Sequence, residues 1–236
     1  MPETTSPVAA IVGVGPGNGA AIARTFSEAG YRVALMARSE TLIAPLAAEL
    51  AGALAVRCDV TDAASIEQAF TVIETRMGPV DTLIYNAGSG VWGTFDDVDA
   101  AALESSWRIN ALGLFNCARQ VTATMKAAGR GNILVVGATA SRRGAAGAAA
   151  FAPAKAAQRT LAESMARHLG PSGIHVALVI IDGRVDAPKA RKASPEKPDW
   201  FFVKPRAVAK NLLWLARQDR SAWSFEIEAR PYAEKW

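Results

Sequence analysis

The sequence predicts an α/β protein with a single doubly wound domain, in which helices cover both faces of a parallel sheet of about seven strands. Short apolar runs alternate with segments of helical periodicity along all 236 residues. A glycine-rich turn joins the first apolar run directly to the first helical segment. No internal repeat or linker divides the chain, so residues 1–236 are expected to form one domain.

Strands are expected where an apolar run is short and ends at turn residues, which is typical of strands buried on both faces. They are expected, in chain order, at Val8–Val14, Arg32–Ala37, Ala53–Val56, Asp81–Tyr85, Asn132–Val136, Ile174–Ile181 and Ser224–Ile227. Helices are expected at Ala20–Ala29, Thr41–Leu50, Ala63–Arg76, Ala100–Ala128, Pro153–Leu169 and Pro205–Ala216. Right-handed crossovers between these strands give a Rossmann-type fold.

Several helix ends carry a local signal. Gly30 suits the position after the first helix, Thr61 can cap the third, and Pro205 suits the first turn of the last. Residues 182–204 follow the sixth strand and are rich in Pro, Lys and Arg. Because connections of this length are usually functional, we expect this segment to be a substrate lid.

Composition excludes several classes of function. Apolar residues make up 50% of the chain and the net charge of +4 is spread along it, without the basic block that binds nucleic acid. The longest nearly apolar run, Ile174–Ile181, is far too short to span a membrane. Residues 1–7 lack the features of a signal peptide, and two cysteines, Cys58 and Cys117, make no disulfide framework. A cytoplasmic protein is expected. The two histidines, His168 and His175, are too isolated to indicate a metal site.

The glycine-rich turn predicts a dinucleotide site, which Gly13, Gly15, Gly17, Asn18 and Gly19 would form. Glycines let the backbone turn tightly and approach a pyrophosphate, which then lies at the N-terminus of the helix.

The end of the second strand favours NADP(H) over NAD(H). An acidic side chain there would bind the ribose hydroxyls of NAD, and this strand ends in Arg38 and Ser39 instead. The planar guanidinium of Arg38 can pair with a 2′-phosphate, and Ser39 can add a hydroxyl.

The spacing Gly13-x3-Gly17-x-Gly19 resembles that of the short-chain dehydrogenase/reductase (SDR) family, and further landmarks follow in order along nearly the whole chain. These are Asp59-Val60 after the third strand, Asn86-Ala87-Gly88 after the fourth, Asn110 within Arg108–Phe115, Lys155 at a helix start, and Gly183 after the sixth strand. The resemblance implies that Asp59 and Val60 flank the adenine, that Asn86, Ala87 and Gly88 line the cofactor cleft, and that Lys155 holds the ribose. It also places Asp182 and Gly183 beside the cofactor, where the family usually has Pro-Gly.

The family's catalytic pattern is broken in this chain. The resemblance implies an asparagine, a serine, a tyrosine and a lysine, of which Asn110 and Lys155 are present. Phe151 stands at the tyrosine position and has no proton to exchange. Ala138 stands at the serine position, although Thr139 or Ser141 could substitute if the loop runs differently.

Three functions remain compatible with the sequence. The first is an NADP(H)-dependent oxidoreductase of a small carbonyl, alcohol or imine-type substrate, with its proton supplied by water, Asp182, Asp186 or Lys155. The second is a non-catalytic NADP(H)-binding sensor or regulatory protein. The third, which nothing positive favours, is a lyase or dehydratase that keeps the cofactor for structure. The persistence of a whole pocket frame with a lid favours the first.

Partners follow from the resemblance as well. In the family, the helices equivalent to Ala100–Ala128 and Pro153–Leu169 pair between subunits. A homodimer or homotetramer is therefore expected, with a small-molecule substrate, no nucleic acid and no membrane.

Overall fold

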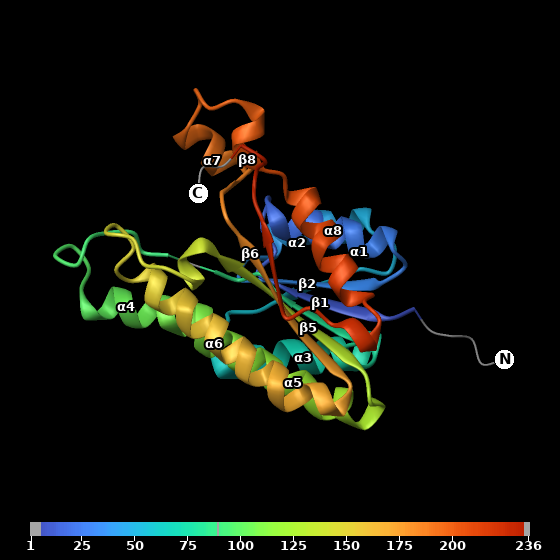
Figure 1. Ribbon diagram of the computed structural model, residues 1–236. Helices are drawn as coiled ribbons and strands as arrows, with labels where there is room; N and C mark the ends of the chain where they lie inside the picture. The colour runs from blue at the N-terminus through green and yellow to red at the C-terminus, as the bar shows by residue number, and fades with distance from the viewer. Residues whose placement is uncertain (1–5, 89, 234–236) are drawn as a thin grey trace.

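The computed structural model describes residues 6–88 and 90–233 and confirms the doubly wound α/β fold (Figure 1). The main sheet of this part of the chain has seven strands, all parallel, in the order β3-β2-β1-β4-β5-β6-β9. The strands are β1 (Val8–Val12), β2 (Arg32–Ala37), β3 (Leu54–Arg57), β4 (Thr82–Tyr85), β5 (Gly131–Ala138), β6 (Ile174–Ile181) and β9 (Glu226–Ala229).

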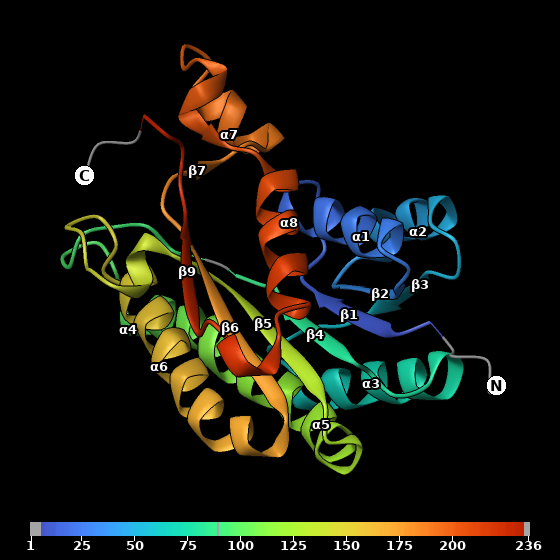
Figure 2. The same ribbon diagram turned by 45° about the vertical axis from the view of Figure 1, so that its right-hand side comes forward.

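Helices cover the two faces of this sheet, as Figure 2 shows. They are α1 (Asn18–Glu28), α2 (Glu40–Glu49), α3 (Ala63–Met77), α4 (Ala100–Trp107), α5 (Gly113–Ala128), α6 (Phe151–Leu169), α7 (Pro188–Ala193) and α8 (Pro205–Ala216). Apolar residues of α3, α5 and α6 pack on one face, and those of α1, α2 and α8 pack on the other.

Side chains of the central strand β1 point alternately to the two faces of the sheet and so belong to both cores. In β1, Val8, Ala10 and Val12 join the core under α3 and α5, whereas Ala9 and Ile11 join the core under α1 and α8. Because both faces are buried, the strand reads as a continuous apolar run. Each fully buried side chain such as Ile11 contributes about 1.5–3 kcal/mol to stability.

Many predicted boundaries differ from the observed ones by one or two residues, and two of the differences have a clear physical reason. The first strand ends at Val12 rather than Val14, because Gly13 takes a left-handed φ of 84° and turns the chain. The single helix expected over Ala100–Ala128 is interrupted by a π-helical turn, Arg108–Leu112, between α4 and α5. Tyr85 packs behind that turn, and its hydroxyl donates to the carbonyl of Ile109 at 2.5 Å.

The segment 182–204 is more regular than an open loop. It contains a short parallel pair, β7 (Arg184–Val185) with β8 (Phe202–Val203), and the helix α7 between them. The carboxylate of Asp186 accepts from Arg191 at 2.6 Å and from Lys204 at 2.8 Å, which ties the two ends of the segment together. Figures 1 and 2 show it standing above the carboxyl edge of the sheet.

Within residues 6–88 and 90–233, no helix combines the length and the apolar character needed to cross a lipid bilayer.

Candidate active site

A cleft opens at the carboxyl edge of the sheet, where β1 and β4 are neighbours and the strand order reverses. It has two halves, of about 460 Å³ each, which share Asn18, Asn86, Gly88 and Val185 in their walls. One half lies along the glycine-rich turn and the ends of β2 and β3. We call it the nucleotide half, and the other the reacting half.

The glycine-rich turn is closed by main-chain contacts that a side chain would block. A Cβ at Gly13 would lie 2.5 Å from the main chain of Ala87, and one at Gly19 would lie 2.6 Å from Val14 Cα. Asn86 fastens the turn from the side, since its Nδ2 donates to the carbonyl of Gly13 at 2.7 Å. This cradle leaves backbone exposed to the nucleotide half, so it fits a pyrophosphate.

Two further residues of the turn face ligand space. A Cβ at Gly15 would meet nothing within 4 Å, so this residue borders the open cleft. The Oδ1 atom of Asn18 is buried and has no hydrogen-bond partner among the described residues. An acceptor placed in this way fits the hydroxyl or amide donors of a dinucleotide.

The far end of the nucleotide half is lined by Arg38, Ser39, Asp59 and Val60. The carboxylate of Asp59 accepts from the amide of Thr61 at 2.9 Å and from its hydroxyl at 2.7 Å. These bonds, with help from the charge of Arg38, hold the pKa of Asp59 below its usual range. Asp59 is therefore ionised, and its carboxylate is bonded within the turn to Thr61. Arg38 is the cation that lines this end of the cleft among the described residues, so it can receive an anionic group.

The reacting half contains one ionisable side chain among the residues described. Its walls are formed by Asn18, Asn86, Gly88, Gly90, Trp92, Val136, Gly137, Ala138, Thr139, Ala140, Phe151, Lys155, Ile181, Gly183 and Val185. Lys155 is that ionisable group, so any acid–base chemistry by a side chain in this wall depends on it.

Lys155 is almost completely buried, with 5% of its surface exposed. Its Nζ donates to the carbonyl of Val136 at 2.9 Å and to Oε1 of Gln158 at 2.8 Å. Burial disfavours the charged form and lowers the pKa of Lys155 to about 7. The side chain can therefore exchange a proton near neutral pH.

Asn110 lies behind Gly88, in the π-helical turn. A Cβ at Gly88 would lie 3.4 Å from Asn110 Oδ1 and 3.8 Å from Lys155 Nζ, so the missing side chain opens the wall to both. The Nδ2 of Asn110 donates to the carbonyl of Ser106 at 2.8 Å, and its own carbonyl accepts from Gln158 at 2.9 Å. The sequence pointed to Asn110 and Lys155 but not to Gln158, whose only signal is a polar residue among the alanines of α6.

Phe151 fills the position at which the family resemblance implies a tyrosine. Its ring packs on Trp92, with centroids 4.9 Å apart. A Cβ at Gly90 would lie 2.6 Å from Phe151 Cδ2, so that glycine leaves room for the ring. An apolar aromatic wall thus stands where a proton donor was expected.

Ser141 and Asp182, both proposed for the site, are not among the residues that line either half of the cleft. Ser141 is buried, and its hydroxyl accepts from the amide of Ala138 at 3.2 Å. Thr139 is the hydroxyl residue that lines the reacting half instead.

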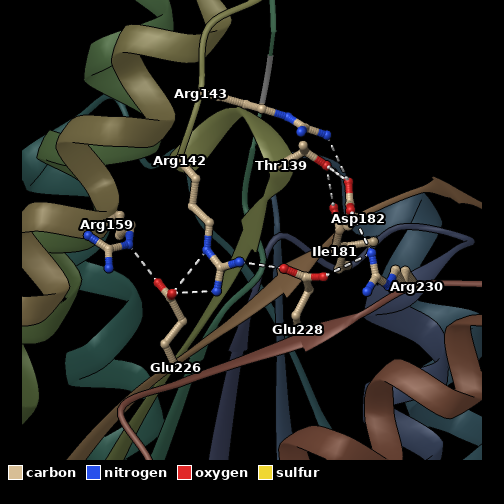
Figure 3. A network of polar contacts seen from close by, with 9 residues as sticks. All are labelled: Thr139, Arg142, Arg143, Arg159, Ile181, Asp182, Glu226, Glu228 and Arg230. Atoms are coloured by element: carbon tan, nitrogen blue, oxygen red, sulfur yellow. Dashed lines mark hydrogen bonds and ion pairs between the residues drawn. The ribbon is translucent and has the colours of Figure 1, made fainter. Parts of the chain in front are cut away.

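Asp182 belongs to a charged network along β9, shown in Figure 3. It accepts from the hydroxyl of Thr139 at 2.5 Å and lies 4.0 Å from Arg143 and 3.9 Å from Arg230. Arg142 pairs with Glu226 at 2.6 Å in the same network. Asp182 thus connects the threonine of the reacting half to the edge of the sheet.

Asp186 is unsuited to donate a proton at neutral pH, although the sequence had suggested it as one source. Its hydrogen bonds to Arg191 and Lys204 hold its pKa well below the usual range, so it stays ionised. It lies in the segment 182–204 and lines neither half of the cleft.

Comparisons with known proteins match this geometry. The sequence profile described as "short chain dehydrogenase" matches residues 7–198. A curated relative, the cyclic-di-GMP-binding biofilm dispersal mediator protein of Escherichia coli, is 30% identical over 230 residues and covers 94% of each chain. A solved short-chain dehydrogenase from Rhodopseudomonas palustris is 34% identical, covers 96% of this chain and 99% of its own, and has a TM-score of 0.81. A metagenomic short-chain oxidoreductase solved with NADP is 28% identical, covers 95% and 97%, and has a TM-score of 0.81.

Proposed function

Because the chain belongs to the short-chain dehydrogenase family, we propose that it is an NADP(H)-dependent oxidoreductase that interconverts a small carbonyl compound and its alcohol. The observation that carries this proposal is Lys155, the one ionisable side chain in the described wall of the reacting half, with a pKa near 7. The glycine cradle and Arg38 support NADP(H) as the cofactor, and the similar oxidoreductase solved with NADP supports it further.

The residues of the nucleotide half would bind the cofactor in an extended form. Gly13, Gly17 and Gly19 receive the pyrophosphate, and Arg38 with Ser39 receives the 2′-phosphate. Asp59 and Val60 flank the adenine. Asn86, Ala87 and Gly88 line the passage toward the reacting half, with Gly183 on the opposite side.

In the direction of reduction, NADPH held in the nucleotide half would supply a hydride for the carbonyl carbon. Lys155 then gives one proton from Nζ to the carbonyl oxygen and becomes a neutral amine, so the product is the alcohol. In the direction of oxidation, the neutral amine takes the proton from the alcohol. Phe151 and Trp92 bound the substrate with apolar surface.

A carbonyl substrate fits this wall better than a preformed iminium ion. The ammonium of Lys155 favours negative charge developing on an oxygen and repels a cation at the same place. A preformed iminium ion already carries its proton and would favour the neutral form of Lys155, so its reduction would not need the ammonium that carbonyl reduction requires.

The test is NADPH oxidation by the purified protein with aldehydes, ketones and cyclic imines, measured from pH 5 to 10. We expect turnover of a carbonyl compound that declines as the pH rises through about 7, because the ammonium form of Lys155 is lost there. Tight NADPH binding without turnover of any compound would overturn the oxidoreductase proposal.

A nucleotide-binding regulatory protein is the second candidate. Phe151 favours it, since this residue removes the usual proton donor while leaving the nucleotide half intact. The relative whose name describes cyclic-di-GMP binding covers 94% of this chain, which favours it as well. The turnover assay separates the two, because the regulatory protein would bind NADPH without oxidising it. Calorimetry with cyclic di-GMP then tests whether that nucleotide is its ligand.

We also propose that the chain acts as a homodimer or homotetramer in the cytoplasm. A hollow of about 510 Å³ runs between α5 and α6 and is bordered by Phe115, which is 43% exposed. A second copy presenting the same helices would cover it. Light scattering on the wild type and on Phe115→Lys tests this, since the lysine should dissociate the assembly.

The buried free thiols Cys58 and Cys117 support a reducing compartment.

A further inference from the structure

Gln158 is a buried polar side chain that has no part in the reaction proposed above. It lies on α6 less than one turn after Lys155, and its side chain is fully buried. Its Oε1 accepts from Lys155 Nζ at 2.8 Å, and its Nε2 donates to the main-chain carbonyl of Asn110 at 2.9 Å. A buried amide is costly unless both ends are paired, and here one partner lines the reacting half and the other lies behind its Gly88 wall.

The bonds of Lys155 fix where its exchangeable proton lies. An ammonium has three N–H donors, and two of them are used by the carbonyl of Val136 and by Oε1 of Gln158. The third position remains for the cleft, whose wall Lys155 helps to form. A neutral amine keeps both bonds with its two remaining hydrogens, and its lone pair takes the third position. Proton transfer then requires no change of rotamer.

We propose that Gln158 is the positioning residue that holds Lys155 with a single N–H, or a single lone pair, directed into the reacting half of the cleft. The inference rests on the proposed function, in which Lys155 exchanges that proton. Through its second bond, Gln158 also couples Lys155 to the π-helical turn, so that Lys155 and Asn110 keep one relative position.

The groups that face Lys155 do not titrate near neutral pH, so a titration there follows Lys155 itself. Val136 faces it from β5, Gln158 from α6 and Asn110 from the π-helical turn, and none of these groups is ionisable. Tyr85, behind the turn, stays neutral because burial holds its pKa well above the usual range. A change in Lys155 is therefore the event that Gln158 should report near neutral pH.

The primary experiment is a nuclear magnetic resonance titration of the wild-type protein without cofactor. The ¹³Cε signal of Lys155 is assigned with Lys155→Met, and the ¹⁵Nε2 signal of Gln158 with Gln158→Met. We expect both signals to change with one midpoint, near the pKa of about 7 given by burial of Lys155. A Gln158 signal that is constant through the Lys155 titration would overturn the proposal.

Two variants and a control extend the test. Gln158→Glu places a carboxylate beside Lys155 and should raise the Lys155 midpoint by about one to three pH units. Gln158→Met removes an acceptor of the ammonium and should lower it. Gln68→Met, on the exposed side of α3, is the matched control and should leave it unchanged. If the Lys155 midpoint is unchanged in both Gln158 variants, Gln158 only packs beside Lys155 and does not position it.

The two proposals can fail separately. If Lys155 and Gln158 titrate together but NADPH is never oxidised, the proposed function fails and the positioning role remains. If turnover follows the Lys155 titration while the Gln158 signal stays constant, the positioning role fails and the proposed function remains. Should the methionine variant not fold, the wild-type Gln158 signal, assigned through Gln158→Glu, still decides.

Discussion

The nucleotide half and the reacting half of the cleft share four wall residues but follow different rules. In the nucleotide half, the wall is largely main chain, and its glycines are fixed by contacts such as that of Gly13 with Ala87. In the reacting half, the wall is made largely of side chains, and Phe151 stands where the family resemblance implies a proton donor. The main-chain cradle therefore leaves little room for substitution, whereas the proposed function requires that Lys155 take over the role of the donor.

The comparison depends most on Lys155, so its removal should have the largest effect. Lys155→Met should lower kcat by about 10²–10⁴-fold, the usual contribution of a positioned acid. It should also abolish the decline of reduction above pH 7, which NADPH oxidation across pH measures. Lys210→Met, on the exposed side of α8, is the control. A residual rate with the wild-type pH profile would mean that the proton comes from elsewhere.

The nucleotide half is tested by Gly13→Ala. The φ of 84° and the distance of 2.5 Å to the Ala87 main chain leave no room for a methyl group, so the turn must shift. We expect NADPH affinity to fall by about 100-fold or more, comparable to losing two charge-assisted hydrogen bonds. Fluorescence titration measures it. Gly144→Ala is the control, because a Cβ there meets nothing within 4 Å.

Cofactor choice is expected to depend on one side chain. Arg38→Ala should weaken NADPH binding by about 10–100-fold, the range for a hydrogen bond to a charged group, and leave NADH binding unchanged. Calorimetry with both nucleotides gives the ratio. Equal losses for NADPH and NADH would show that Arg38 supports the fold of the turn and not the 2′-phosphate.

The Phe151→Tyr variant tests whether a phenolic hydroxyl can act as a proton donor in the reacting half. A phenolic hydroxyl on this ring would enter the wall that holds Lys155, so we expect kcat for reduction to rise by about tenfold, a part of the full effect of a positioned acid. Phe151→Leu is the control for lost aromatic packing on Trp92. A tyrosine variant no faster than wild type would indicate that Lys155 already saturates proton transfer.

The smallest effect is expected in the lid, outside both halves. Asp186→Asn removes the carboxylate that pairs with Arg191 and Lys204, and partial exposure limits the cost to below about 1 kcal/mol. Because the pKa of Asp186 is lowered in the folded protein, its carboxylate stabilises the fold fully at pH values above the usual carboxyl pKa. This stabilisation is lost as the pH falls below that value. Thermal unfolding at pH 7 and pH 3, with Asp96→Asn as the control, measures it.

Sequence reasoning reached the fold and the nucleotide half because periodicity and glycine spacing act locally. The seven strands and the glycine-rich turn were predictable in this way, whereas Asp59 was named only through the family resemblance. The polar partners were not predictable, because Gln158 meets Asn110 across 48 positions and Thr139 meets Asp182 across 43. The π-helical turn was missed because Tyr85, distant in sequence, packs behind it.

Burying Lys155 also couples folding to acidity. The unfolded chain keeps this proton until the pH approaches 10.5, whereas the folded protein releases it at about 7. Between those values the unfolded state binds more protons, so resistance to unfolding rises with pH, and below 7 the full cost of a charged buried amine remains. Thermal unfolding of the wild type should accordingly show stability rising from pH 7 to pH 9, and Lys155→Met should lose this rise. One buried amine thus links the stability of the fold to pH.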